Sequence, residues 1–353
     1  VALPAFADFG YLLFPVDRPV TNDMTLADIS DSATYLWYNY IDPEKTVEIV
    51  NELKHRAESG ETIFYDIYTD TEKAADPSLN DTGLFFFRGQ PGAKFAVCNA
   101  GGGMVFVGSM HDSFPHALEL SKMGYNAFTL IYRPGYDTSV EDLARAIVYL
   151  HDHAAELEID MTDYSLWGGS AGARMAAWLG SHGTESYGEK AYPRPAAVIM
   201  QYTGYTYTSS SDAPTYACVG TLDGIASYRT MQSRLNTLES YGIPTEFHSY
   251  DGLPHGFGLG TETVAEWWIF DAVSFWESQM GDGSLPKVRQ VRNLQDFLLT
   301  KPTDKDLSDK DYDMNEDGRW DVFDLCLMKR ELLNDSIEFG TQEKDGFIVD
   351  DSR

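Results

Sequence analysis

A serine stands at the centre of a glycine-rich motif near the middle of the 353-residue chain. The motif, Gly168-Gly169-Ser170-Ala171-Gly172, has the pattern G-x-S-x-G and follows a strand predicted at Tyr164–Trp167. A helix is predicted directly after it. Between a strand and a helix, these glycines allow a turn so sharp that the central side chain stands above the sheet. The spacing therefore predicts Ser170 as a nucleophile.

His255 is the predicted base for this serine, because a serine hydroxyl is a poor nucleophile unless an oriented base activates it. His255 lies on a loop shaped by Gly and Pro, just after the last predicted strand. The chain has eight histidines. Of the others, His55, His151 and His153 are expected to be solvated on helices, His182 to end a helix, and His248 to lie within a strand.

Asp223 is the predicted third member of the site. It follows the strand predicted at Thr215–Val219 and lies between the other two residues, in the chain order Ser, Asp, His that one kind of catalytic triad uses. Asp251 competes, since it precedes His255 by only four residues. Its Asp-Gly context favours a turn in which the side chain bonds its own backbone. Asp212, in a Ser-rich loop, is expected to be solvated.

Backbone donors for an oxyanion are predicted after the strand Lys94–Asn99. This strand ends in Ala100-Gly101-Gly102-Gly103, where the absence of side chains lets the backbone approach a substrate. The N–H groups of Gly101 and Gly102, together with that of Ala171, are the predicted donors.

The elements around these residues alternate between strand and helix. Helices are expected at residues 42–60, 115–123, 139–153, 171–179, 228–241 and 264–279, and strands at 62–69, 94–99, 126–132, 164–167, 196–201, 215–219 and 245–250. Such alternation predicts an α/β fold, a mostly parallel sheet with helices on both faces. Function in such sheets gathers at the carboxyl ends of the strands, which is where the candidate residues lie.

With these parts in place, residues from about 60 to 280 resemble an α/β-hydrolase of the esterase and lipase branch. One departure is Ala100, where that branch has a His before the glycines. The resemblance implies ester hydrolysis through an acyl-enzyme without a cofactor: Ser170 attacks, His255 transfers the proton and Asp223 orients His255. Residues 1–60 are expected to be an N-terminal extension or cap.

A second module is expected from Gly281, where the composition changes. Side-chain oxygens follow the spacing of an EF-hand loop, which wraps one Ca²⁺ and uses a backbone carbonyl at its seventh position. The predicted ligands are Asp313, Asn315, Asp317, Arg319 through its carbonyl, Asp321 and Asp324. A helix is expected at residues 322–333, and an earlier copy of it lies 34 residues upstream, with Leu294 at the position of Met328. The loop before that copy lacks the ligands, so one Ca²⁺ is expected.

Residues 281–334 therefore resemble a dockerin, a small all-α module that binds a cohesin of a cellulosome scaffold. The resemblance implies a secreted enzyme in a cell-surface cellulosome, with cohesin as its partner. Val322, Phe323 and Arg330 are the candidate contact residues, although Val322 and Phe323 fit a core equally well. Residues 335–353 are expected to form a flexible tail.

The composition of the chain excludes some classes of binding partner. The net charge of −29 excludes nucleic acid and anionic membranes as main partners, and no apolar run reaches the length of a membrane span. The chain begins at Val1 without a basic leader, so an export signal is expected to have been removed or left out. The three cysteines, Cys98, Cys218 and Cys326, are widely spaced and are expected to be small buried residues.

These features together predict a cellulosomal carbohydrate esterase that removes acetyl or feruloyl groups from xylan or another hemicellulose. Tyr202, Tyr205 and Tyr207 could stack on a sugar or phenolic ring, or could form one face of an extended segment. Two alternatives stay open: a lipase or peptidase attached by the same module, and a non-catalytic binding protein that keeps the fold.

Overall fold

The computed structural model describes residues 42–281 and 320–337, together with residues 294, 298, 312 and 314. The chain divides into two compact units, Val1–Met280 and Gly281–Arg353. The division coincides with the change in composition at Gly281.

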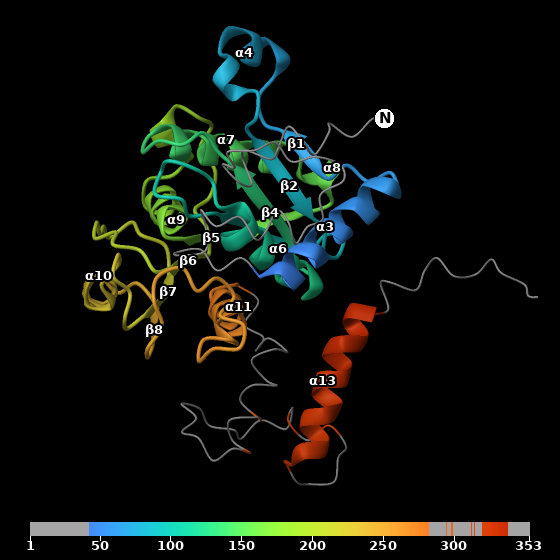
Figure 1. Ribbon diagram of the computed structural model, residues 1–353, viewed down its shortest axis with the longest axis vertical. Coiled ribbons are helices and arrows are strands. Elements are labelled where there is room, and N and C mark those ends of the chain that lie inside the picture. Colours follow the sequence, from blue (N-terminus) through green and yellow to red (C-terminus); the bar gives the residue numbers. More distant parts are fainter. Residues whose placement is uncertain are drawn as a thin grey trace, which may run out of the picture. The chain divides into compact units, whose positions relative to one another are not determined.

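Within the described residues, an eight-stranded sheet forms the centre of the large unit (Figure 1). Its strands are β1 (Phe64–Asp66), β2 (Gly83–Phe87), β3 (Lys94–Asn99), β4 (Asn126–Ile131), β5 (Asp160–Gly169), β6 (Ala197–Gln201), β7 (Thr215–Gly220) and β8 (Thr245–Tyr250). They lie in the order β1-β2-β4-β3-β5-β6-β7-β8. β2 pairs antiparallel with β1 and β4, and the remaining pairs are parallel.

The register of the sheet brings the predicted site to one edge. Asn99 at the end of β3 lies opposite Gly168 of β5, and Gly169 lies opposite Gln201 at the end of β6. The loops that leave these three strands therefore begin at the same level.

Helices cover both faces of this sheet (Figure 1). The helices described in the large unit are α3 (Pro43–Glu58), α4 (Asp70–Ala75), α5 (Ser109–Asp112), α6 (Phe114–Lys122), α7 (Thr138–Asp152), α8 (Ala154–Leu157), α9 (Ala171–His182), α10 (Tyr228–Ser240) and α11 (Trp268–Ser278), with single 3-10 turns at Pro77–Leu79 and Thr184–Tyr187. The short α4 protrudes beyond the end of the sheet (Figure 1). Successive strand residues point to opposite faces. Phe85 and Phe87 contact Phe114 of α6, while Phe86 between them stacks on Phe128, on the face that α7 and α9 cover.

Parts of the N-terminal half differ from the prediction. The strand expected at residues 62–69 is limited to Phe64–Asp66, and β2 was not predicted. All five residues of β2 are buried, so its sequence, Gly83–Phe87, lacks the alternation that marks a half-exposed strand. The short helices α4 and α5 were not predicted either.

The helix expected after Asp42 is present and belongs to the large unit. The Asp42 side chain accepts hydrogen bonds from the backbone N–H groups of Glu44 and Lys45, and so caps α3 as its sequence predicts. Ile49 and Leu53 of α3 are buried in the same core as the sheet. Residues 1–41 of the expected extension lie outside the described residues.

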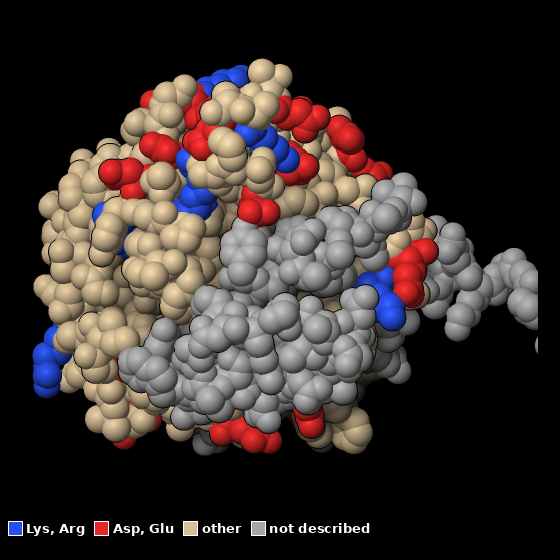
Figure 2. Space-filling model, turned by 45° about the horizontal axis from the view of Figure 1, so that its top comes forward, with Lys and Arg blue, Asp and Glu red and all other residues tan. Residues whose placement is uncertain are grey.

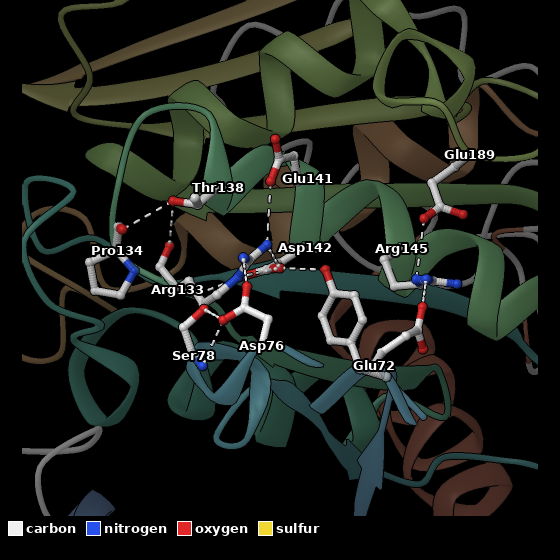
Figure 3. A network of polar contacts seen from close by, with 11 residues as sticks. Glu72, Asp76, Ser78, Arg133, Pro134, Thr138, Glu141, Asp142, Arg145 and Glu189 are labelled. Atoms are coloured by element: carbon white, nitrogen blue, oxygen red, sulfur yellow. Dashed lines mark hydrogen bonds and ion pairs between the residues drawn. The ribbon is translucent and has the colours of Figure 1, made fainter. Parts of the chain in front are cut away.

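A buried carboxylate on α7 anchors the loop that leaves β4 (Figure 3). Asp142 is fully buried, and its oxygens lie 2.7 Å from Nη2 and from the backbone N of Arg133. Tyr68 donates its hydroxyl to the same carboxylate at 2.6 Å. One turn along α7, Arg145 bonds Glu72 of α4. These bonds hold the segment around α4 against α7.

Acidic side chains are spread over the visible surface of the large unit (Figure 2). Figure 2 shows acidic side chains at several separate places on the visible face, with basic ones among them. In the described part of the chain, no helix combines the length and the apolar composition needed to cross a membrane.

The second unit has a small core of its own. Its helix α13 (Val322–Ile337) contributes Met328, which is buried together with Leu294 and Tyr312. Leu294 and Met328 are one of the pairs of positions that the internal repeat equates. α13 continues to Ile337, into the segment expected to be a tail, and residues 338–353 lie outside the described residues.

Candidate active site

Ser170 occupies the turn between β5 and α9, and its backbone lies in the left-handed region with φ of +51°. A non-glycine residue held there stores strain. The neighbouring glycines leave no room for side chains: a Cβ on Gly172 would lie 2.0 Å from the carbonyl oxygen of Asn99, and one on Gly168 would lie 2.2 Å from the carbonyl carbon of Gly172. The turn therefore requires these glycines, as the motif indicates.

The three predicted side chains form one hydrogen-bonded row. His255 Nε2 lies 3.1 Å from Ser170 Oγ, and His255 Nδ1 lies 2.8 Å from Asp223 Oδ2. The Asp223 carboxylate is fully buried, and its other oxygen accepts the N–H groups of Ile225 and Ala226 at 2.8 and 2.7 Å. Asp223 Oδ2 can therefore accept the proton on His255 Nδ1. His255 Nε2 then faces Ser170 Oγ as the base.

The competing acids lie elsewhere. Asp251 is exposed and accepts the Thr221 hydroxyl at 3.0 Å. Asp212 was expected to be solvated, but it is buried and pairs with Arg234 at 3.0 Å. The sequence could not show this pairing, because Arg234 comes from α10.

Among the other histidines, the expectation for His151 was wrong. Its side chain is buried and stacks on Tyr192, with ring centroids 4.1 Å apart. Burial lowers the pKa of His151 to about 4. His248 lies in β8, where it pairs with Glu246 at 2.7 Å.

The structure corrects one of the predicted oxyanion donors. The N–H of Gly101 donates to Asp112 Oδ2 at 2.8 Å and is therefore not free for a substrate. The N–H groups of Gly102 and Ala171 donate to none of the described residues. A Cβ on Gly101 would lie 3.1 Å from Ser170 Cβ, so this loop runs directly beside the nucleophile. Gly102 and Ala171 remain as the candidate donors.

Two buried residues beside the site were not identified from the sequence. Asp112 of α5 receives the N–H of Gly101 and the hydroxyl of Tyr202. Burial and the neighbouring carboxylate raise the pKa of Tyr202 well above its usual value, so its hydroxyl stays a donor. Positive φ at Tyr202, +33°, marks the turn after β6, but the sequence carries no signal of it.

Tyr202 is therefore excluded as a ring that stacks on substrate. Tyr205 is also buried, and Tyr207 alone of the three predicted tyrosines is exposed. Tyr205 and Tyr207 both contact Trp178, whereas Tyr202 lies at a turn and contacts His255 and Phe257. The three rings therefore do not form one face.

Large apolar side chains are exposed on the loops at the carboxyl ends of the strands. They are Val105 after β3, Tyr136 after β4, and Leu222 and Ile225 after β7. A cavity of about 740 Å³ borders the loop that carries His255; its lining includes Met110, His111, Pro254, Phe257 and Leu259. The loops at the edge of the sheet where the serine lies thus expose apolar side chains.

Of the six predicted calcium ligands, Asp321 and Asp324 lie among the described residues, and Asp313, Asn315, Asp317 and Arg319 do not. The Asp324 carboxylate is buried and accepts the N–H groups of Met314 and Asp321 at 2.9 and 2.8 Å. The second, ninth and twelfth positions of the predicted loop therefore meet at one carboxylate.

The predicted partner contacts separate in the structure. Val322 and Phe323 at the start of α13 are 56% and 66% exposed, which excludes the core interpretation for both. Arg330 lies in α13, and its side chain is outside the described part. Cys98 and Cys218 are buried as expected, whereas the expectation for Cys326 was wrong because it is exposed.

Comparison with known proteins agrees with the fold. A family model described as BD-FAE, a hydrolase family, matches residues 91–198, which include the glycine loop and Ser170. None of the curated proteins matches the chain.

Two solved structures are among those that resemble it. The acetyl ester-xyloside bifunctional hydrolase from Caldicellulosiruptor lactoaceticus has a TM-score of 0.55 and 20% identity, over 61% of this chain and 95% of that one. A thermophilic esterase from Thermogutta terrifontis has a TM-score of 0.51 and 19% identity, over 57% and 90%. The latter esterase has also been solved after phosphorylation by paraoxon. The chain thus has the fold of these hydrolases, and the family model that matches residues 91–198 indicates a hydrolase.

Proposed function

We propose that the large unit is a serine esterase in which Ser170, His255 and Asp223 form the catalytic triad. The observation that carries the proposal is the row of contacts at 3.1 and 2.8 Å that joins the three side chains. This unbroken row also speaks against a non-catalytic binding protein.

The geometry suits a two-step reaction. Ser170 Oγ attacks the ester carbonyl while His255 Nε2 takes its proton, and the N–H groups of Gly102 and Ala171 face the oxyanion. His255 then gives the proton to the departing alcohol, which leaves an acyl-serine. Water, deprotonated by His255, attacks the acyl carbon. The bond to Ser170 Oγ then breaks, His255 returns the proton to Oγ, and the acid is released. Asp223 holds the Nδ1 proton and stabilises the imidazolium in both steps.

We further propose acetyl or feruloyl esters of xylan or another hemicellulose as substrates. The fold neighbour that acts on an acetyl ester and a xyloside supports this choice. The exposed apolar side chains on the loops at the carboxyl ends of the strands would contact the acyl group and the sugar faces. A lipase or a peptidase remains the competing class.

The test is a release assay on acetylated xylan beside feruloylated arabinoxylan, with Ser170→Ala as the control. Acetate or ferulate should appear with the native enzyme, and Ser170→Ala should lower the rate by several orders of magnitude. Hydrolysis of a simple aryl acetate without release of acid from either xylan would support the esterase activity and contradict the proposed substrate. Equal rates for both proteins would remove Ser170 from the mechanism.

For the second unit, we propose one Ca²⁺ and a cohesin partner, on a secreted enzyme. The loop closure at Asp324 and the exposed Val322 and Phe323 support this role. Calorimetric titration of the full chain should show one Ca²⁺ site, which Asp313→Ala abolishes. A second site would contradict the expected loss of ligands in the first repeat.

Cohesin binding has its own test. Replacement of both Val322 and Phe323 by Asp should weaken binding of a cohesin module at saturating Ca²⁺, and should leave esterase activity unchanged. Since both side chains are exposed, the double variant should also keep its melting temperature. Unaltered affinity would place the docking surface elsewhere.

A further inference from the structure

A second buried carboxylate, Asp112, lies beside the triad and takes no part in the mechanism above. It belongs to α5, the short helix that follows the glycine loop, and is 3% exposed. One carboxylate oxygen accepts the N–H of Gly101 at 2.8 Å. The other accepts the Tyr202 hydroxyl and lies 3.4 Å from His111 Nε2. Its partners thus come from the loop after β3 and the turn after β6.

The same carboxylate fills the space beside the nucleophile. A Cβ on Gly101 would lie 2.4 Å from Asp112 Oδ2, and one on Gly169 would lie 2.7 Å from the carboxyl carbon of Asp112. Gly169 directly precedes Ser170. Both positions must therefore be glycine for Asp112 to occupy this place. One of these glycines belongs to the loop after β3, and the other to the turn that carries Ser170.

Hydrogen bonds fix the backbone of Gly101 on both sides. Its N–H is held by Asp112, and its carbonyl accepts the N–H of Gly108 at 2.9 Å. In a planar trans peptide, the N–H of Gly102 points opposite to the carbonyl of Gly101. The two bonds together therefore set the direction of the Gly102 N–H, one of the two candidate oxyanion donors.

Tyr202 extends the contacts of Asp112 to the base. Its ring meets the His255 ring edge to face, with centroids 5.0 Å apart, and meets Phe257 in the same way at 4.9 Å. Since the hydroxyl of Tyr202 is bound to Asp112, the carboxylate also restrains the surface against which His255 packs.

We infer that Asp112 is a positioning residue of the esterase: it holds the glycine loop so that the Gly102 N–H faces the oxyanion. This inference rests on the proposed function. Asp112 acts through Gly101 and does not touch the reacting atoms. It also explains why the N–H of Gly101 is unavailable to the substrate and which of the adjacent amides replaces it.

The test compares Asp112→Ala, Asp112→Asn and a matched control, Asp142→Asn, with an aryl acetate as substrate. Asp112→Ala should lower kcat about 10²-fold, the usual effect of losing an oxyanion donor, and change KM little. Asp112→Asn should restore most of kcat, because its oxygen can accept the Gly101 N–H while its amide donates to Tyr202. Asp142→Asn makes the same change at a buried carboxylate of α7 and should lower the melting temperature without lowering kcat.

A second readout separates positioning from general damage. Phenylboronic acid forms an anionic tetrahedral adduct with a catalytic serine, so its affinity, measured by calorimetry, reports on the oxyanion donors. Asp112→Ala should weaken it by a factor similar to the loss of kcat. Unchanged affinity in Asp112→Ala, or an Asp112→Asn variant as impaired as Asp112→Ala, would overturn the inference. If native enzyme and Ser170→Ala hydrolyse the ester equally, the proposed function fails instead.

Discussion

Two buried carboxylates flank the same serine, and they are held in opposite ways. Asp223 takes its backbone donors from Ile225 and Ala226, two and three residues further along its own loop. Asp112 takes its donors from Gly101 and Tyr202, 11 and 90 residues away. The contacts of Asp223 are local in sequence, so sequence analysis could identify this residue. The contacts of Asp112 come from distant segments, and sequence analysis missed it.

The largest effect that tests this contrast is expected for Asp223→Asn. The two backbone N–H groups keep the amide oxygen on their side, so the amide nitrogen faces His255 Nδ1. His255 must then carry its proton on Nε2 and cannot accept one from Ser170. We expect kcat to fall about 10³- to 10⁴-fold, measured on an aryl acetate. Asp251→Asn is the matched control and should stay within about twofold; a comparable loss there would exchange the two assignments.

A smaller effect is expected for Tyr202→Phe, which removes one donor to Asp112 and keeps the ring against His255. Gly101 still donates to the carboxylate, so kcat should fall by no more than about tenfold, with KM unchanged. Steady-state kinetics beside Asp112→Ala check this order. If Tyr202→Phe lowered kcat more than Asp112→Ala did, the packing of Tyr202 against His255 would matter more for catalysis than the hydrogen bond from Gly101 to Asp112.

The smallest effect concerns a group that burial perturbs away from the site. The pKa of His151 is lowered to about 4 from 6.5, so between these values the unfolded chain binds a proton that the folded chain does not. Stability therefore falls as the pH drops through this window. His151→Phe should remove up to about 3 kcal/mol of that fall. Urea unfolding at pH 7 and pH 4.5 measures it, with the exposed His55→Gln as control. An equally steep loss in His151→Phe would assign the acid sensitivity to other groups.

Local signals explain which elements could be predicted. The cap of α3 at Asp42 and the turn at Ser170 depend on residues within a few positions of each other, and both occur as predicted. β2 was missed because all of Gly83–Phe87 is buried, in a strand paired on both edges by β1 and β4, so its sequence does not alternate. Asp212 was misjudged for the same reason, since its partner Arg234 lies on a helix that follows the next strand.

In the second unit, too, local patterns predicted some features and only the tertiary structure decided others. Its repeat equated Leu294 with Met328, and both residues enter one small core. Sequence left Val322 and Phe323 undecided between core and surface, and the three-dimensional structure exposes both. Periodicity identifies a helix face, whereas only the neighbours decide whether that face is covered.

By itself, the sequence determined the α/β alternation and the residue types and chain order of Ser170, Asp223 and His255, because each depends on short-range patterns of glycine, polarity and strand length. The tertiary structure alone decided which amides are free to face an oxyanion. Gly101 and Gly102 are chemically identical neighbours, and only the arrival of Asp112 from α5 occupies one and leaves the other. A hydrogen bond between distant segments exists only once the chain has folded, so no local pattern can distinguish the two glycines.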